Sequence, residues 1–286
     1  MPTKVSKLNS IEKVNRSFYL SMPCIYCMIC IMIRFMNRIK AVGFDLFNTL
    51  ITVEPHALDD AENRLTRSLQ QSGLALEHEP FKQAHREAAV RFIRETRRDG
   101  RETHNRFWVS AALQSQGYNV LPDDSRIATA VDAYFSAFLP YCHLIPGTSE
   151  MLSKLKGLYR LGLLSNFTHA PAAKEIINGV GLTSLFDVVL ISGDLGYRKP
   201  HPLVFRRLIE QLRVEKDEII YVGDDPEPDI TGAQRAGLQP VWTTYVRDRN
   251  IPPAPGVLSR SSEKADPNVP RISTWKELMT LLEDKN

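Results

Sequence analysis

The stretch AVGFDLFNTLI, residues 41–51, decides the fold of this chain. Its apolar run is typical of a buried parallel strand, and it ends in a single carboxylate, Asp45, followed two residues later by Phe47. A carboxylate at a strand end indicates a nucleophile or a metal ligand, whereas the ring of Phe47 cannot transfer a proton. A lone Asp at such a place is also common as a cap or turn residue, so the rest of the sequence has to decide.

Two blocks of different character follow this stretch. Residues 58 to about 138 are rich in Ala, Leu, Glu, Gln and Arg at helical spacing, with breaks at Gly100 and at 116–125, which predicts an all-helical insert. Beyond residue 150, strand and helix patterns alternate, which predicts a parallel sheet with helices on both faces. The predicted strands span residues 160–167, 186–196, 218–225 and 239–245, and the predicted helices span residues 151–159, 170–182, 202–212 and 229–238.

Both ends of the chain look different from this body. Residues 247–271 are rich in Pro and Ser and predict a long loop, followed by a helix over 274–284. The uncharged run at 18–33 is short for a membrane span, contains Pro23 and lacks a cleavage site. We therefore expect residues 1–36 to be an apolar extension outside the fold, with weak membrane association through 18–33 as the alternative. Its three cysteines, which lack a nearby fourth ligand for an iron–sulfur cluster, are Cys24, Cys27 and Cys30.

The composition limits the possible partners and compartment. With 286 residues, 43% of them hydrophobic, the chain can bury a large core. A formal charge of +3 gives no bulk attraction to nucleic acid, so no nucleic-acid partner is expected. Four cysteines are too few for a disulfide scaffold, and we expect a cytoplasmic protein. The sequence does not determine the oligomeric state.

Polar side chains gather at the ends of four predicted strands. Parallel strands bring their carboxyl ends to one edge of a sheet, where ligands bind, so we expect these side chains to converge. The four groups are the isolated carboxylate of Asp45, the hydroxyl and amide of Ser165 and Asn166, the ammonium of Lys199, and the carboxylate pair of Asp224 and Asp225.

These strand ends resemble the four motifs of the haloacid dehalogenase superfamily of hydrolases, over about residues 39–245. The matching stretches are FDLFNTL with Asp45 and Thr49, LLSNF with Ser165, GYRKPHPLVF with Lys199, and VGDDPEPDITGAQRAG with Asp224 and Asp229. The chain is identified as a member of the subfamily I type, whose helical cap follows the first motif. The resemblance implies a Rossmann-like parallel-sheet core in residues 37–54 and 141–286, with an inserted all-helical cap domain in residues 55–140.

The resemblance also implies a role for each matching residue. Asp45 would be the nucleophile that attacks phosphorus, with Ser165 and Lys199 as its catalytic partners and Mg²⁺ as the cofactor. The metal ligands would be Asp45, Asp224 and the backbone carbonyl of Phe47, since Mg²⁺ prefers hard oxygens. Substrate would bind at Thr49 and Asn166, while Asp225 and Asp229 would orient a metal water or Lys199.

Phe47 is the main departure from the family pattern, which has a second Asp there to protonate the leaving group. The first hypothesis is a Mg²⁺-dependent phosphohydrolase that prefers leaving groups needing no proton, or that borrows an acid such as His56. The second is a 2-haloacid dehalogenase, which needs no acid but typically lacks the GDD carboxylates. The third is a phosphate-binding or regulatory protein with little turnover.

The cap is expected to choose the substrate, which we expect to be a small phosphorylated or acidic metabolite. Arginine suits carboxylate and phosphate recognition, although arginines on helices usually face solvent. A phosphonate hydrolase would need a cap lysine, and the insert offers only Lys82. The basic run in the insert consists of Arg86, Arg91, Arg94, Arg97, Arg98, Arg101 and Arg106.

Overall fold

A computed structural model describes residues 39–255 and 265–285 of the chain. The predicted extension, residues 1–36 with Cys24, Cys27 and Cys30, lies outside the described residues. Within the part that the structure describes, none of the helices is both long and apolar enough to cross a membrane.

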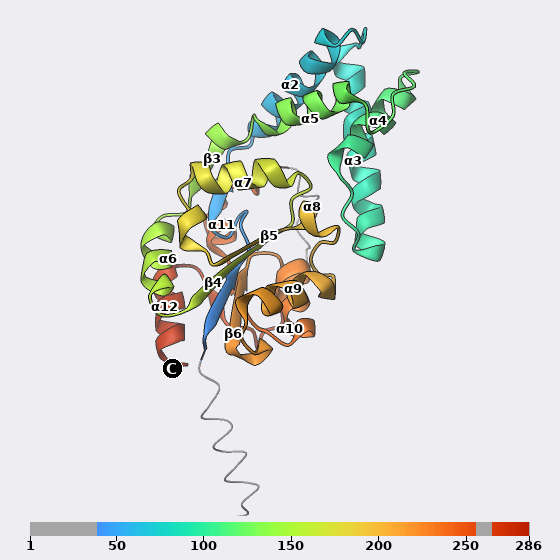
Figure 1. The fold of residues 1–286 in the computed structure, drawn as a ribbon. Coiled ribbons are helices and arrows are strands. Elements are labelled where there is room, and N and C mark those ends of the chain that lie inside the picture. The colour runs from blue at the N-terminus through green and yellow to red at the C-terminus, as the bar shows by residue number, and fades with distance from the viewer. Residues whose placement is uncertain (1–38, 256–264, 286) are drawn as a thin grey trace, which may run out of the picture. The chain divides into compact units, whose positions relative to one another are not determined.

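A six-stranded parallel sheet forms the centre of the described chain, in the order β5-β4-β1-β6-β7-β8, so the predicted α/β fold is confirmed (Figure 1). The strands are β1 (Ala41–Phe44), β4 (Arg160–Ser165), β5 (Val188–Ile191), β6 (Ile219–Gly223), β7 (Gln239–Thr243) and β8 (Arg271–Ile272). Phe44, the last residue of β1, is opposite Leu163 of β4 and Val222 of β6. The strand order reverses at β1, so the chain segments that leave β1, β4 and β6 meet at one edge, where ligands bind in such sheets.

Helices cover both faces of this sheet, as predicted (Figure 1). Phe44 packs edge-on against Trp275 on one face. On the other face, a Cβ on Gly43 would lie 3.1 Å from Leu208 Cδ2, and one on Gly162 would lie 2.7 Å from Leu208 Cδ1. Leu208 belongs to the helix α9 (Pro202–Leu212). Glycine in two neighbouring strands therefore lets α9 lie close to the sheet. The first face carries α6 (Thr148–Lys156), α7 (Ala170–Gly179) and α12 (Trp275–Glu283), and the second carries α9 (Pro202–Leu212) and α10 (Gly232–Ala236).

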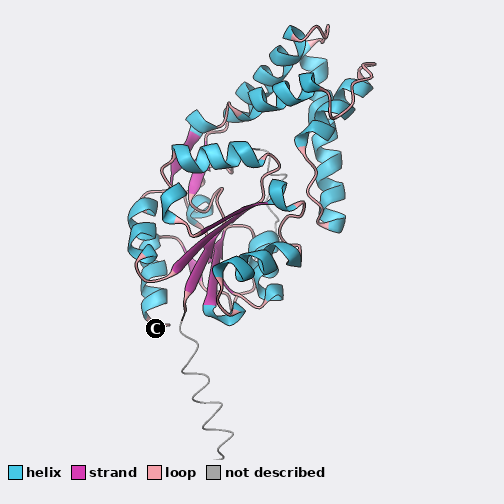
Figure 2. Cartoon of the chain, in the orientation of Figure 1, coloured by secondary structure: helices cyan, strands magenta, loops and turns pink. Residues whose placement is uncertain are grey.

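The predicted insert consists of helices joined by loops (Figure 2). They are α2 (Ala57–Gln71), α3 (His78–Asp99), α4 (Asn105–Ser115) and α5 (Ser125–Phe135), of which α2 packs on α5 and α3 on α4. Their buried residues recur at helical spacing, as Leu65 and Leu69 do in α2. The two chain crossings into and out of the insert form an antiparallel pair, β2 (Ile51–Val53) and β3 (Cys142–Leu144). The proposed cap bounds, residues 55 and 140, lie just inside this pair.

The predicted strand over residues 186–196 is wrong in its second half. β5 ends at Ile191, and α8 (Ser192–Leu195) follows, ending at Gly196 with φ of 72°. Ser192 Oγ accepts a hydrogen bond from Phe167 N, at 2.8 Å, and a Cβ on Gly193 would lie 2.5 Å from the carbonyl oxygen of Thr168. Tertiary contacts with residues 167 and 168, which follow β4, therefore turn the chain where the apolar pattern predicted a continuing strand.

The predicted loop over residues 247–271 is also more structured at its two ends. α11 (Tyr245–Asp248) includes its first two residues, and Arg271 belongs to β8, which pairs with β7. The remaining short elements are three 3₁₀ turns, η1 (Leu139–Tyr141), η2 (Thr183–Leu185) and η3 (Lys216–Glu218), and a π-helical turn, η4 (Pro226–Thr231).

Candidate active site

Asp45 lies directly after β1, at the edge where the strand order reverses. Its backbone N–H donates to the carbonyl of Val222, at 2.9 Å, which extends the pairing with β6 by one residue. Its side chain is nearly buried: Oδ2 accepts a hydrogen bond from Thr49 Oγ1 at 3.1 Å, and Oδ1 accepts one from Lys199 Nζ at 2.6 Å. Thr49, predicted to bind substrate, therefore orients the predicted nucleophile in this structure.

Lys199 connects two carboxylates in the buried part of the site. Its Nζ, on a side chain only 2% exposed, donates to Asp45 Oδ1 and to Asp229 Oδ1, both at 2.6 Å, and to Tyr221 Oη at 3.0 Å. An ammonium has three donors, so these contacts use all of them. Burial lowers the pKa of Lys199, but Asp229 and Asp45 outweigh it and raise this pKa well above its usual value. The ammonium is therefore charged throughout the neutral range.

Asn166 fixes the backbone that carries this lysine. Its Oδ1 accepts a hydrogen bond from Lys199 N at 2.8 Å, and its Nδ2 donates to the Lys199 carbonyl at 3.0 Å. The Asn166 side chain thus holds Lys199 in place from the end of β4, and the predicted contact of the Asn166 backbone with substrate stays a prediction.

Three carboxylates converge at this edge of the sheet. Asp45, Asp224 and Asp229 each offer an oxygen, all within 4.8 Å of one another, and all three residues are buried. Asp224 follows β6, and its carbonyl accepts a hydrogen bond from Trp242 Nε1 at 2.9 Å. Clustered carboxylate oxygens are the hard ligands that Mg²⁺ prefers, so this donor set fits that ion.

Asp229 approaches the other two because β6 ends in Gly223. A Cβ on Gly223 would lie 2.4 Å from Asp229 Cβ, closer than any side chain allows. Asp229 uses Oδ1 for Lys199 and Oδ2 for the Asp225 backbone N–H, at 3.0 Å. Asp229 thus contacts Lys199 directly, and its role in orienting a metal water or Lys199 stays a prediction.

Burial of the carboxyl groups raises their pKa values. Burial raises the pKa of Asp45 to about 6, against the lowering effect of Lys199, and Asp229 adds to the rise. Burial and Asp229 together raise the pKa of Asp225 to about 6 as well. Perturbed pKa values that cluster in a cleft are typical of functional sites.

At the ends of β4 and β6, two buried polar atoms lack a hydrogen-bond partner among residues 39–255 and 265–285. They are Ser165 Oγ, at the carboxyl end of β4, and Asp225 Oδ1. Ser165 is fully buried, and a buried hydroxyl without a partner pays its desolvation in full. Ser165 does not itself line the cavity described next, so its predicted catalytic contact with a ligand stays a prediction.

A cavity of about 460 Å³ opens onto the converging carboxylates described above. Core residues such as Asp45, Lys199 and Asp224 line it on one side, and residues of α3, α4 and α5 line it on the other. This volume is in the range of small-molecule sites. Residues from both the core and the insert therefore surround one candidate active site.

Phe47 lies in this cavity as part of an aromatic row. Its ring stacks on that of Phe167, with centroids 5.2 Å apart and an angle of 14°. Phe167 in turn contacts Phe135 of α5, also at 5.2 Å. An apolar contact between core and insert thus occupies the place where the family's second Asp would stand.

The loop after α11 also reaches the site, which the sequence did not predict. Ala254 and Pro255 line the cavity, and Ala254 N donates to Asn48 Oδ1 at 2.8 Å. Asn48, next to Phe47, has φ of 60°, a conformation that Asn tolerates. The sequence could not predict this contact, because the group that the loop brings to the site is a backbone N–H, which every residue except proline carries.

Several other residues considered from the sequence do not line this cavity. His56 is exposed and pairs with Glu54 at 2.7 Å, so it is not positioned as a substitute acid. Lys82 lies between Glu62 and Glu79, which removes the support for a phosphonate hydrolase. Of the seven arginines in the basic run, those that line the cavity are Arg97 and Arg98.

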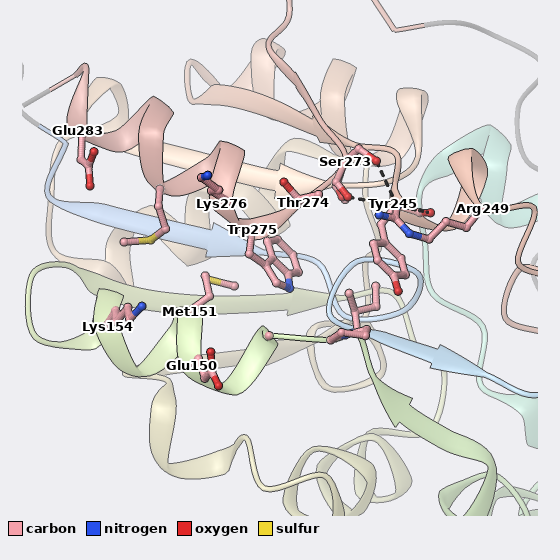
Figure 3. A pocket seen from close by; sticks show the side chains of 15 residues that line it. Glu150, Met151, Lys154, Tyr245, Arg249, Ser273, Thr274, Trp275, Lys276 and Glu283 are labelled. Atoms are coloured by element: carbon pink, nitrogen blue, oxygen red, sulfur yellow. Dashed lines mark hydrogen bonds between the residues drawn. The ribbon is translucent and has the colours of Figure 1, made fainter.

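A second and larger cavity, of about 690 Å³, lies between α6 and α12 (Figure 3). Its sides carry Lys154 from α6 and Lys276 and Glu283 from α12, while Trp275 Nε1 donates to Thr148 Oγ1 at 3.0 Å. None of the clustered carboxylates described above lines it. The clustered carboxylates, rather than the volume of the cavity, therefore identify the candidate active site.

Known proteins resemble this chain over most of its length. The family model described as haloacid dehalogenase-like hydrolase matches residues 39–237. The ribulose-1,5-bisphosphate 5-phosphatase of Halopiger xanaduensis is 32% identical over 206 residues, which cover 70% of this chain and 83% of that protein. The phosphoglycolate phosphatase of Rhodospirillum rubrum is 30% identical over 232 residues, 77% of this chain and 86% of that one. The crystal structure of 2-haloacid dehalogenase from Pseudomonas syringae pv. Tomato DC3000 has 24% identity and a TM-score of 0.63, covering 87% of this chain and 100% of that one; this likeness shows the fold.

Proposed function

Because this chain belongs to the haloacid dehalogenase-like hydrolases, as its four motifs predicted, we propose that it is a Mg²⁺-dependent phosphohydrolase of a small phosphorylated metabolite. Its relatives named as phosphatases support a phosphatase-like hydrolase. The observation that carries the proposal is the convergence of Asp45, Asp224 and Asp229 around Lys199. Clustered buried charges are costly to keep without a bound ion or substrate. A cytoplasmic location remains a prediction from the composition.

In the proposed reaction Asp45 is the nucleophile. One oxygen of its carboxylate forms a bond to phosphorus, and the bond from phosphorus to the leaving oxygen breaks with its electron pair going to that oxygen. Thr49 holds the carboxylate in orientation, and Lys199 neutralises charge on Asp45 and on the transferred group. Water then attacks the aspartyl phosphate, which releases inorganic phosphate and restores Asp45.

The remaining site residues bind the phosphoryl group and the cation. Ser165 Oγ, which has no partner within the described ranges, would donate to a phosphoryl oxygen. Asp45, Asp224 and the backbone carbonyl of Phe47 would hold Mg²⁺, with Asp229 keeping Lys199 in place. When bound, Mg²⁺ screens the repulsion between the carboxylates and the phosphoryl oxygens.

Phe47 limits the substrates that this site can process quickly. A phenylalanine cannot protonate a leaving alkoxide, so the enzyme is expected to favour leaving groups that need no proton, such as the carboxylate of an acyl phosphate. The same residue is the one observation that favours a second candidate, a 2-haloacid dehalogenase, because a departing halide also needs no proton. The three converging carboxylates weigh against that candidate, since attack on carbon needs no metal.

A direct test compares acetyl phosphate, para-nitrophenyl phosphate and 2-chloropropionate, each with and without Mg²⁺, with the Asp45→Asn variant as the blank. The proposal expects Mg²⁺-dependent phosphate release that is fastest for acetyl phosphate and lost in the blank. Chloride release without metal would instead make the chain a dehalogenase. Phosphate binding without turnover of any substrate would make it a binding protein.

A further inference from the structure

The helix α4 presents unsatisfied polar atoms to the active-site cavity. Asn105 is 1% exposed, and although its side chain lies close enough to the buried His85 ring to raise the pKa of that histidine, neither its Nδ2 nor its Oδ1 completes a hydrogen bond within the described chain. The buried indole Nε1 of Trp108 likewise has none. Both residues line the cavity of about 460 Å³ that contains Asp45. Residues three apart on a helix share a face, so these atoms belong to one patch of wall.

Such a patch is unusual for a folded protein. Most buried polar groups have a partner, because an unpaired one loses its bonds to water without replacement. Ser110, on the same helix and also buried, shows the ordinary situation, since its hydroxyl donates to the Val120 carbonyl at 2.6 Å. Of the unsatisfied atoms on α4, those of Asn105 and Trp108 belong to residues that line the cavity, whereas Arg106, whose Nε is also unsatisfied, does not line it.

The part of the cavity wall that the insert supplies carries more positive than negative charge, whereas the core side also brings acids such as Asp224 and Glu227. Arg97 and Arg98, at the end of α3, line the same cavity. The acid beside them, Asp99, accepts a hydrogen bond from Arg101 N at 2.9 Å. The insert therefore contributes two cations and one acid to the wall, together with two neutral side chains that can donate.

We propose that Asn105 Nδ2 and Trp108 Nε1 bind a free carboxylate at the end of the substrate remote from the phosphoryl group. A carboxylate is acceptor-only, which matches the donor-only indole and the donor end of the amide. The substrate class is then a short phosphorylated carboxylic acid, held by its phosphoryl end at Asp45 and by its carboxylate at α4. This inference rests on the proposed function for the identity of the phosphoryl end.

The test compares two acyl phosphates of equal length, succinyl phosphate and butyryl phosphate, which differ in the free carboxylate. Wild-type protein should show a kcat/KM at least tenfold higher for succinyl phosphate. Trp108→Phe and Asn105→Leu should each lower that value about 10- to 100-fold while leaving butyryl phosphate within a factor of three. Phe107→Leu is the matched control, because Phe107 lies on α4 but is exposed and does not line the cavity.

Different failures are distinguishable in this design. Equal kcat/KM for the two substrates in the wild type would overturn the carboxylate site and leave the phosphohydrolase intact. If neither substrate is hydrolysed, the proposed function fails, and calorimetric titration with succinate still decides the inference. Binding by the wild type that is lost in Trp108→Phe, with unchanged thermal unfolding, supports it, whereas succinate binding that is absent or equal in both proteins overturns it.

Discussion

Replacing Phe47 by Asp should give this enzyme activity toward alkyl phosphates. The new carboxyl group would stand two residues after Asp45, in the cavity wall, where a proton can reach a leaving oxygen. General acid catalysis contributes about 10²- to 10⁴-fold to such reactions. We expect an increase in kcat at the lower end of this range, about 10²-fold for glycerol phosphate. The surroundings of Phe47 fit an aromatic ring, because Phe47 stacks on Phe167, which contacts Phe135, so a carboxyl group there would not be ideally oriented.

The structure also sets the expected cost of this change. Loss of the stacked pair with Phe167, whose centroids are 5.2 Å apart, removes about 0.5–1.5 kcal/mol beyond the buried area itself. Acetyl phosphate needs no proton for its leaving group, so its kcat should change less than tenfold. The gain should therefore be selective for the leaving group rather than general.

Steady-state phosphate release from glycerol phosphate and acetyl phosphate measures this selectivity. Phe47→Asn is the matched control, since it has nearly the shape of Asp but no acidic proton, and urea unfolding reports the stability of each variant. If the Asp and Asn variants hydrolyse glycerol phosphate equally fast, a missing proton donor is not what limits the enzyme, and the reasoning about Phe47 is refuted.

Three further perturbations test the site and the cap. Lys199→Met should lower the free energy of unfolding by about 3–5 kcal/mol in urea, because it leaves buried Asp45 and Asp229 without their cation; unchanged stability would contradict the buried network. Asp224→Asn should raise the Mg²⁺ concentration for half-maximal activity by about tenfold or more, and an unchanged requirement would remove Asp224 from the metal site. Burial lowers the pKa of His85 to about 4, below the unfolded value of about 6.5, so the unfolded chain binds more protons between these values. His85 should therefore contribute a fall of about 2 kcal/mol in the free energy of unfolding between pH 7 and pH 5, which opposes the rise expected from the raised pKa values of Asp45 and Asp225. The stability of the wild type relative to His85→Gln should fall by about that amount over this interval, and an unchanged difference would contradict the buried neutral ring.

The sequence was most informative where local pattern and chemistry agree. The apolar run before Asp45 predicted a central strand, because a buried parallel strand is apolar on both faces. The family motifs predicted both Lys199 and Asp229, whereas the expectation that Lys199 directly follows a strand is wrong, because α8 intervenes after β5. In the structure Lys199 Nζ donates to both Asp45 and Asp229. The role of each of these residues remains to be tested by the experiments above.

The sequence was least informative where a contact depends on the folded chain. A two-residue strand such as β8 has no periodicity to detect, and the β2–β3 pair joins residues on either side of the insert. His56 was considered as an acid that could replace the missing Asp, yet it does not line the cavity. Asn105 and Trp108 belong to no motif, and the lack of hydrogen-bond partners that draws attention to them can be seen only in the folded chain.

The central place of β1 also bears on how the protein is made. β1 leaves the ribosome before every other strand of its sheet, but its hydrogen-bonded neighbours begin only at Arg160 and Ile219. Pairing between such distant segments must pay loop-closure entropy first and is slow. A nascent chain that ends before Lys199 therefore carries Asp45 without the ammonium and the acids that surround its carboxylate in the folded protein. The complete carboxylate cluster can form only after residue 229 has been added to the chain.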